Sequence, residues 1–452
     1  MIVAKFGGTS VADSSAIRRL TEVVGARRSE GPVVVVSALA RVTDALLGLS
    51  AMVERDDRAA LDAAMAALVE RHATTAEALG PSAEQAMESI ADDAAALRAD
   101  LAAARGRPLR PAELDALAGR GELWSSRLVA AALDDAGLAP AWVDIRPILI
   151  TDGRYGRATP QMQAFTARAR ECIRPLVEAG RVPVTQGFIG ATADGTPTTL
   201  GRGGSDFTAA LLGAALAVSR VEIWTDVNGL MTADPRIVPE ARTLRFASYE
   251  EAAELATFGA KVLHPATAQP LVRAGIPIVV LNSSRPDDPG TTIEASAELE
   301  RLGDSPVRSI SWKHGITVIN VRAPRMLGAY GFLRAMFEVF ERHEVVVDVL
   351  ASGEVSVSLT VEDDSRLGPV VRDLSELGEV WTERDRALVA VVGIGLRTTP
   401  GLAARLFRAV QPANVEVISQ GASAINVTFV VRAQDGPGVV RRLHQEFFGP
   451  AQ

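Results

Sequence analysis

The amino-acid sequence predicts an α/β fold around a mostly parallel sheet, followed by two small repeated domains. Over about the first 295 residues, short apolar segments rich in β-branched residues alternate with helical patterns, as buried parallel strands alternate with the helices that connect them. The C-terminal part contains an internal repeat. It superposes without a gap after a shift of 70 positions, since Gly331 falls on Gly401 and Phe337 falls on Phe407.

The elements predicted in the first region are short strands, apolar on both faces, with helices between them. The strands are Ile2–Phe6, Val33–Ser37, Ala141–Ile145, Val182–Phe188, Val221–Thr225 and Ile278–Leu281. The clearest helices are Ser14–Arg28, Phe207–Val218 and Tyr249–Leu263. We therefore expect a three-layer αβα sandwich over residues 1–295.

Two stretches interrupt this alternation. From about Asp44 to Ala136 the chain is rich in alanine, with leucines three and four residues apart, which predicts an inserted helical subdomain over about 44–136. The polar, proline-containing run 282–290 marks the end of the α/β region and leads to a linker around 294–308.

Each C-terminal repeat reads as a strand, a loop with glycine, a helix and two further strands. We expect one such domain over 309–385 and a second over 386–452. Two copies of a small βαββ unit suggest a paired sensor for a small molecule rather than a second active site.

Composition excludes several classes of protein. The net charge is −8 without a long basic block, which argues against nucleic acid as a partner. Apolar runs such as Pro32–Val36 are far shorter than the roughly 20 residues of a membrane span. The single cysteine, Cys172, and five scattered histidines offer no metal-ligand spacing, so no protein-built metal site is expected. The N-terminus lacks a signal-peptide pattern, and we expect a cytoplasmic protein.

Two glycine-rich loops are suited to binding phosphate. Lys5 ends the first strand, and Gly7 and Gly8 open a turn before a helix, so backbone N–H groups and a lysine could hold an oxyanion. Taken alone, this segment is better explained by an ordinary tight turn with a surface lysine. In the second loop, three glycines beside Arg202 and Asp206 precede a helix and form an anion-binding nest with a bidentate cation. The P-loop pattern GxxxxGK[ST] is absent.

Two further segments carry polar groups. A buried strand ends at Thr225 and Asp226, and the carboxyl ends of strands are where open α/β sheets bind ligands. Lys261 interrupts an apolar helix end, which a snorkelling surface lysine would explain as well.

Taken together, these segments resemble those of the single-function aspartate kinases, including the lysine-sensitive type, in the amino-acid kinase superfamily. The C-terminal units resemble paired ACT domains, which are ferredoxin-like and bind amino acids. The resemblance covers essentially the whole chain. The matching motifs are Lys5-Phe6-Gly7-Gly8-Thr9-Ser10-Val11, Gly121-Glu122-Leu123, Gly187-Phe188, Gly201-Arg202-Gly203-Gly204-Ser205-Asp206, Trp224-Thr225-Asp226-Val227 and Phe258-Gly259-Ala260-Lys261-Val262-Leu263-His264-Pro265.

The resemblance implies a phosphotransferase with a carboxyl group as acceptor. ATP, with Mg²⁺, would phosphorylate the side-chain carboxylate of L-aspartate to 4-phospho-L-aspartate, the first step toward lysine (through diaminopimelate), threonine and methionine. The implied catalytic residues are Lys5, Asp206 and Lys261; the ATP contacts are Lys5, Gly7, Gly8, Thr225, Asp226, Met231, Arg236 and Lys261; the aspartate contacts are Thr43, Glu122, Phe188, Arg202 and Ser205.

Arg202 would grip the α-carboxylate and Glu122 the ammonium group of the substrate. One departure from the family is Met231, which stands where relatives usually carry tyrosine near the nucleotide. Two other functions stay open: a kinase of another amino acid such as glutamate, and a non-catalytic amino-acid sensor.

The resemblance also implies regulation by a bound amino acid. In lysine-inhibited relatives the first ACT unit binds lysine at a dimer interface, so feedback inhibition by lysine and a homodimer or dimer of dimers through the ACT domains are expected. The matching positions are Met326, Phe332, Leu333, Asp348, Ser352, Glu354 and Val355. Asp348 and Glu354 could pair with a cationic effector, although Gly353 stands where a hydroxyl residue is common.

Overall fold

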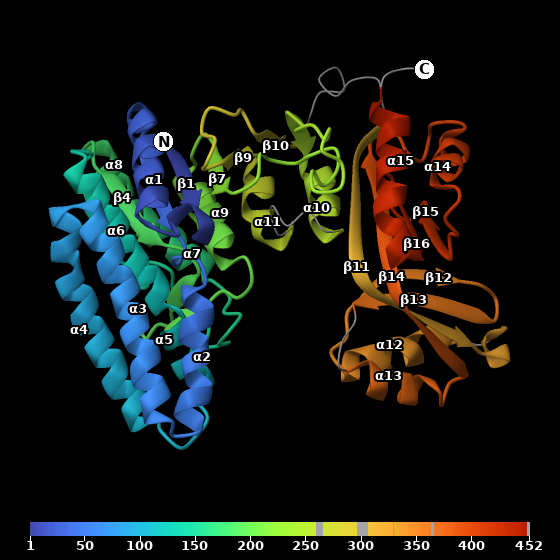
Figure 1. Cartoon of the computed structure of the whole chain (residues 1–452), viewed down its shortest axis with the longest axis horizontal. Coiled ribbons are helices and arrows are strands. Elements are labelled where there is room, and N and C mark those ends of the chain that lie inside the picture. The colour runs from blue at the N-terminus through green and yellow to red at the C-terminus, as the bar shows by residue number, and fades with distance from the viewer. Residues whose placement is uncertain (259–264, 296–305, 329, 363–365, 450–452) are drawn as a thin grey trace. The chain divides into compact units, whose positions relative to one another are not determined.

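The computed structural model describes residues 1–258, 265–295, 306–328, 330–362 and 366–449, which form two compact units (Figure 1). The first unit holds the described residues of 1–230, 245–249 and 262–297, and the second holds those of 231–244, 250–261 and 298–452. The first unit is therefore not the continuous segment 1–295 that the sequence suggested, because two short segments belong to the second unit.

The first unit is built on an eight-stranded sheet in the order β3-β4-β2-β1-β7-β9-β10-β8. All paired neighbours are parallel except β9 and β10. The strands are β1 (Ile2–Phe6), β2 (Pro32–Val36), β3 (Pro140–Val143), β4 (Val182–Gln186), β7 (Val221–Thr225), β8 (Phe246–Ser248), β9 (Ile278–Asn282) and β10 (Thr291–Glu294). The mostly parallel sheet expected from the sequence is confirmed. Every residue of β1, β2 and β4 is buried, as strands covered on both faces require.

Helices cover both faces of this sheet. Helix α6 contacts β2, β3 and β4, and α9 contacts β1, β2 and β7 from the other layer, with α7 and α11 packed against α9. The helices of the first unit are α1 (Ser14–Ala26), α2 (Val42–Glu54), α3 (Arg58–Leu79), α4 (Pro81–Ala103), α5 (Pro111–Ala118), α6 (Arg120–Asp135), α7 (Met162–Cys172), α8 (Arg174–Glu178), α9 (Gly204–Leu216) and α11 (Pro265–Ala274). A small hairpin, β5 (Ile189–Ala191) with β6 (Pro197–Thr199), was not predicted.

The inserted helical subdomain is present, because α2 to α6 lie between β2 and β3 in the chain (Figure 1). Some predicted boundaries shift. The strand expected to reach Phe188 ends at Gln186, because Phe188 takes a left-handed backbone with φ of 70° and the chain turns there. The helix expected over Tyr249–Leu263 is α10 (Tyr249–Thr257), and residues 259–264 lie outside the described part of the chain.

The second unit contains one six-stranded antiparallel sheet in the order β12-β13-β11-β14-β16-β15. Its elements are β11 (Val307–Arg322), α12 (Phe332–Arg342), β12 (Val347–Ser352), β13 (Ser356–Glu362), α13 (Leu367–Leu374), β14 (Glu379–Gly393), α14 (Leu402–Val410), β15 (Val417–Gln420), β16 (Asn426–Arg432) and α15 (Gly436–Phe448). The repeat is confirmed with one addition, a second helix in each copy. Gly331 and Gly401 both precede a helix in left-handed conformation, with φ of 82° and 75°.

The two repeats share strands rather than meeting at a simple boundary. Val307 and Ile310, at the start of β11, belong to the core of the second repeat, whereas Ile319 and Val321 of the same strand belong to the core of the first. The boundary expected between residues 385 and 386 therefore falls inside β14. Among the described residues, every helix is too short or too polar to cross a lipid bilayer.

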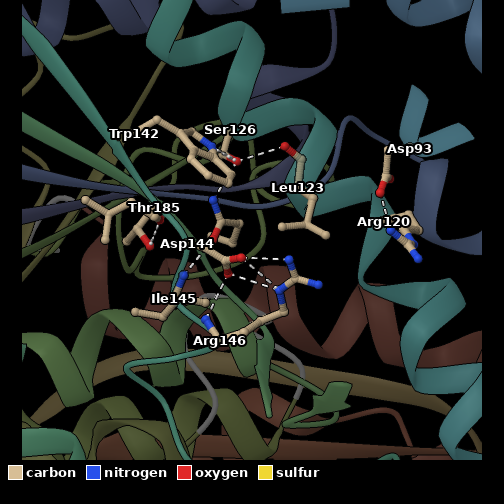
Figure 2. Close-up of polar contacts among 11 residues, drawn as sticks. Asp93, Arg120, Leu123, Ser126, Trp142, Asp144, Ile145, Arg146 and Thr185 are labelled. Carbon is tan, nitrogen blue, oxygen red and sulfur yellow. Dashed lines mark hydrogen bonds and ion pairs between the residues drawn. The ribbon is translucent and has the colours of Figure 1, made fainter. Parts of the chain in front are cut away.

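A buried polar network fastens α6 to the edge of the sheet (Figure 2). The hydroxyl of Ser126 accepts hydrogen bonds from Trp142 Nε1 at 2.9 Å and from Gln186 Nε2 at 2.8 Å, and donates to the carbonyl of Leu123. Gln186 Oε1 in turn accepts from the amide of Ile145 at 2.9 Å. Since Gln186 is fully buried, each of its polar atoms needs these partners.

Replacing Gln186 with leucine should lower the free energy of unfolding by about 1–3 kcal/mol, because the buried amide of Ile145 loses its acceptor. Chemical denaturation measures this change. The exposed Gln163 on α7 supplies the matched control, and Gln163→Leu should change the free energy by less than about 0.5 kcal/mol. Equal, small effects of both substitutions would show that the network does not hold α6.

Candidate active site

A pocket of about 730 Å³ opens at the carboxyl ends of the parallel strands of the first unit. Its walls come from the segments that follow β1, β2 and β4, from the loop before α9, and from α2, α5 and α6. Open parallel sheets bind ligands at this edge. The predicted site residues that line the pocket are Lys5, Gly8, Thr43, Glu122, Phe188, Arg202, Ser205 and Asp206.

An ion pair between Lys5 and Asp206 forms one wall. Lys5 Nζ lies 2.7 Å from Asp206 Oδ1, and only 10% and 16% of the two side chains are exposed. Lys5 is the last residue but one of β1, and Asp206 lies in the first turn of α9, where the helix dipole favours a carboxylate. A largely buried ammonium group requires such a partner.

The turn after β1 is fixed by hydrogen bonds at the ends of β7 and β9. The amide of Gly7 donates to the carbonyl of Trp224 at 3.1 Å, and Ser10 Oγ donates to Ser283 Oγ at 2.8 Å, which ties the turn to the ends of β7 and β9. A Cβ at Gly8 would lie 3.1 Å from the carbonyl oxygen of Ala38, so the absence of a side chain lets the two loops approach. The turn is therefore a fixed platform beside the Lys5 ammonium group.

Glu122 projects into the pocket from the start of α6. It is 3% exposed, and burial raises the pKa of its carboxyl group to about 8, against backbone hydrogen bonds that include one from Ala38. Its Oε2 has no hydrogen-bond partner among the described residues. The helix is pressed against the loop after β2, because Ser125 Oγ donates to the carbonyl of Ser37 at 2.7 Å. A buried, incompletely paired carboxyl group is typical of a ligand-binding position.

Arg202 lies on the loop between β6 and α9. It is exposed, lines the pocket, and makes no hydrogen bond or ion pair with any residue that the structure describes. Beside it, Phe188 keeps its strained left-handed backbone because its amide donates to Thr208 Oγ1 at 3.1 Å and its carbonyl accepts from Leu200. Such strain often marks a functional site. The guanidinium group of Arg202 is therefore available to an anionic ligand.

Other predicted residues are not gathered by this pocket. Thr225 is the last residue of β7 and Asp226 follows it. Thr225 Oγ1 donates to Asp226 Oδ1 at 3.2 Å, but neither residue is among those that line the pocket. Met231 and Arg236 belong to the second unit, where Arg236 forms a two-pronged ion pair with Asp234. Lys261 lies outside the described residues. The nucleotide contacts predicted at these positions stay predictions.

The predicted effector residues lie in the first repeat of the second unit. Met326 and Phe332 pack against its core. Asp348 is paired within the chain itself, with Lys313 Nζ 3.4 Å from its Oδ1, and burial raises the pKa of its carboxyl group. Asp348, the carboxylate predicted to bind the effector, therefore already pairs with the ammonium group of Lys313. The remaining positions, Leu333, Ser352, Glu354 and Val355, are exposed.

Sequence reasoning missed several residues that line the pocket. Arg41 follows β2 in a left-handed conformation with φ of 66°, and Asp115 and Tyr155 come from α5 and from the loop after β3. Asp115 is one of two acids on α5, beside Glu113, and the sequence does not set it apart. Its partners are distant in sequence, so no local pattern could have revealed its role.

The chain resembles known proteins over nearly its whole length. The amino acid kinase family matches residues 1–282, and an ACT domain family matches residues 389–447. Lysine-sensitive aspartokinase 3 of Escherichia coli is 37% identical over 460 residues, which cover 99% of each chain. Aspartokinase 1 of Arabidopsis thaliana chloroplasts is 32% identical over 461 residues, which cover 99% of this chain and 80% of the relative.

Solved structures show the same similarity. The crystal structure of E. coli aspartokinase III with aspartate and ADP superposes with a TM-score of 0.85 at 36% identity, covering 99% of this chain and 100% of that one. The same enzyme with lysine and aspartate gives 0.84 at 36% identity and covers 99% of both chains. The aspartate kinase of Clostridium acetobutylicum gives 0.79 at 26% identity, also over 99% of both chains.

The raised pKa of Glu122 predicts a pH-dependent stability. The pKa in the folded chain, about 8, lies above the ordinary value of 4.5, so this group's contribution is fully present below about pH 4.5 and is lost as pH rises through about 8. Glu122→Gln stays neutral at every pH. Without ligands, the variant should therefore gain stability relative to the parent chain between about pH 5 and about pH 8.5, as measured by denaturant unfolding. A difference that does not change with pH would contradict the raised pKa.

Proposed function

The chain belongs to the aspartokinases of the amino acid kinase family, and on that premise we propose how its pocket transfers the γ-phosphoryl group of ATP to the side-chain carboxylate of L-aspartate. One observation carries the proposal. The pocket holds a paired lysine at the turn after β1, and it also presents a buried glutamate and an arginine that has no partner among the described residues. The first group suits phosphates, and the other two together suit the two charged groups of an amino acid.

The acceptor needs no general base. A side-chain carboxylate has an ordinary pKa near 4 and is already ionised at neutral pH. The barrier comes from bringing this anion against the phosphates of ATP, so catalysis rests on position and on neutralising charge. The site residues would serve that task rather than proton transfer.

Lys5 would hold the β- and γ-phosphates together with the amide of Gly8, whereas the amide of Gly7, predicted from the sequence to share this role, already donates to the carbonyl of Trp224 and supports the turn. Asp206 fixes the direction of the Lys5 ammonium group through their 2.7 Å contact. Mg²⁺, which neutralises phosphate charge when it arrives with ATP, fits here because Asp206 offers a carboxylate beside the phosphate position, and Mg²⁺ is usually held by one or two carboxylates together with phosphate oxygens. We assign Lys261, Thr225, Asp226, Met231 and Arg236 to the nucleotide by family resemblance.

Arg202 would bind the α-carboxylate of aspartate with two hydrogen bonds, and Glu122 would bind its ammonium group. Thr43, Phe188 and Ser205 complete the wall. In the empty pocket Glu122 holds a proton at neutral pH, because its pKa is raised to about 8. An ammonium group beside it favours the carboxylate, so Glu122 releases that proton as aspartate enters.

Regulation by lysine is part of the same proposal. The E. coli relative named above is lysine-sensitive, and its structure with lysine resembles this chain. In this chain Lys313 already pairs with Asp348, the carboxylate that we propose for the effector's ammonium group. A bound lysine would take over this contact, while Lys313 keeps its second partner, Glu362, at 2.6 Å. Exposed Leu333 and Phe337 on α12 suit assembly of two chains through this domain.

Two substitutions separate the phosphate and aspartate ends of the pocket. Lys5→Ala should lower kcat by at least about two orders of magnitude, because a preorganised charge at the phosphates is lost. Arg202→Ala should instead raise the KM for aspartate about ten- to a hundredfold and leave the KM for ATP nearly unchanged. The assay measures the acyl phosphate product, trapped as hydroxamate, with aspartate and Mg-ATP as substrates. Near-normal turnover in Lys5→Ala, or a defect confined to ATP in Arg202→Ala, would overturn these assignments.

Lysine titration tests the regulatory assignment. Lysine should inhibit the enzyme, and Asp348→Asn should raise the half-inhibiting concentration at least about tenfold, since a charged hydrogen bond is lost. Rates are expressed relative to each variant's uninhibited rate. Asp373→Asn, which alters a carboxylate of the same repeat that pairs with Arg342 on the helix side, should respond like the parent chain. Equal responses of both variants, or none in the parent, would remove lysine as the effector at this position.

A further inference from the structure

The carboxylate of Asp115 ties three segments of the pocket together. The amide of Gly156 donates to both of its oxygens, at 3.0 and 2.9 Å. Thr199 donates twice, from its amide to Oδ2 at 2.7 Å and from Oγ1 to Oδ1 at 2.9 Å. Asp115 is 5% exposed, and within the described ranges it forms no ion pair with a basic side chain. Neutral donors alone therefore surround this buried side chain, and its two oxygens accept all four contacts, of which the two from Gly156 share one N–H.

Two of the three segments are connected to Arg202, one through the chain and one through packing. Thr199 is the last residue of β6 and stands three positions before Arg202 in the chain. Gly156 packs against Gly201, where φ is +77° and an added Cβ would lie only 2.8 Å from the Gly156 carbonyl oxygen. The amide of Ala158 also donates to the carbonyl of Thr199 at 2.8 Å. The backbone that presents Arg202 is thus fixed through the partners of Asp115.

The third segment leads to Glu122. Asp115 lies on α5, and a single residue, Gly119, separates α5 from α6. Gly119 is tightly packed, since a Cβ there would lie 2.8 Å from Ile189 Cγ2. Glu122 follows in the first turn of α6. Asp115 therefore links the helix pair that carries the ammonium-binding glutamate to the loop that carries the carboxylate-binding arginine.

We propose that Asp115 is a positioning residue that sets the separation between Arg202 and Glu122, and through it the preference for aspartate over the longer glutamate. This inference rests on the proposed function of the same pocket. The two groups that hold the amino-acid end of the substrate decide how far its side-chain carboxylate reaches toward Lys5. A one-methylene difference is discriminated only if that end is held rigidly.

Asp115→Asn tests the proposal by exchanging one carboxylate oxygen for an NH₂ group. The amide nitrogen of asparagine must face an N–H or O–H donor, so at least one of the four bonds is lost. We expect the KM for aspartate to rise about tenfold, with kcat and the KM for ATP within about twofold of the parent chain. The ratio of kcat/KM for aspartate to that for glutamate should fall at least about tenfold. Unchanged aspartate KM and selectivity in the folded variant would overturn the proposal.

Asp93→Asn is the matched control. This carboxylate also joins two helices of the same subdomain, accepting from Trp124 Nε1 at 2.7 Å and pairing with Arg120, but it does not line the pocket. Its loss should reduce stability without changing the KM for aspartate. If Asp93→Asn shifts that KM as much as Asp115→Asn does, the effect is general destabilisation and the proposal fails.

A double-mutant cycle shows whether Asp115 acts through Arg202. In an Arg202→Ala background, adding Asp115→Asn should change the KM for aspartate by less than about twofold, because the positioned group is already absent. Multiplicative effects of the two changes would contradict action through Arg202.

Thr199 provides a second route if Asp115→Asn does not fold. Thr199→Ser keeps the hydroxyl donor and should preserve selectivity, whereas Thr199→Val should lower it in the same direction as Asp115→Asn. Identical selectivity in both would overturn the proposal. A parent chain that forms no acyl phosphate from aspartate refutes the proposed function. An active parent chain with unaltered selectivity in these variants refutes only the role of Asp115.

Discussion

The ion pair between Lys5 and Asp206 is the contact on which the pocket depends. It joins the carboxyl end of a central strand, β1, to the first turn of α9 across 2.7 Å. An ammonium group as buried as that of Lys5 would be costly without a counter-charge, and Asp206 is itself favoured by the dipole of the helix it begins. The pair therefore keeps a cation oriented at the edge of the sheet, beside a turn whose amides are suited to phosphate.

Three carboxyl groups of the pocket, two of them buried and that of Asp206 largely so, have three different kinds of partner, and each kind matches a role. Asp206 has the ammonium group of Lys5 as its partner, at the end of the pocket proposed for phosphate. Asp115 accepts hydrogen bonds from neutral N–H and O–H donors and joins the segments of Gly156 and Thr199 to α5. Glu122 has one oxygen without a hydrogen-bond partner among the described residues, and burial raises the pKa of its carboxyl group to about 8. This group is suited to a positively charged ligand. Environment rather than residue type thus decides which acid is structural and which binds substrate.

Much of this arrangement could be predicted from sequence because it is local. The glycine turn after Lys5 and the loop before α9 are contiguous motifs, and the repeat of 70 positions locates both copies of the regulatory domain. Contacts between distant segments could not be read in this way. Nothing in the local pattern shows that Asp115 meets Thr199, 84 positions away, or that Glu254 of α10 binds Asn426 and so belongs to the regulatory unit. Domain boundaries are also difficult to predict where a strand such as β14 is shared, because one apolar segment contributes to the cores of both repeats.

The central claim, that this pocket joins the γ-phosphoryl group to the side-chain carboxylate of aspartate, can be tested by following one oxygen atom. Aspartate labelled with ¹⁸O in its side-chain carboxylate is incubated with enzyme and Mg-ATP, and the acyl phosphate is cleaved with hydroxylamine, which attacks the carbonyl carbon and releases the bridging oxygen with phosphate. The account predicts that this phosphate carries one ¹⁸O by mass spectrometry or ³¹P NMR. Unlabelled phosphate would contradict it, and so would ¹⁸O in the phosphate obtained from aspartate that is labelled only in its α-carboxylate.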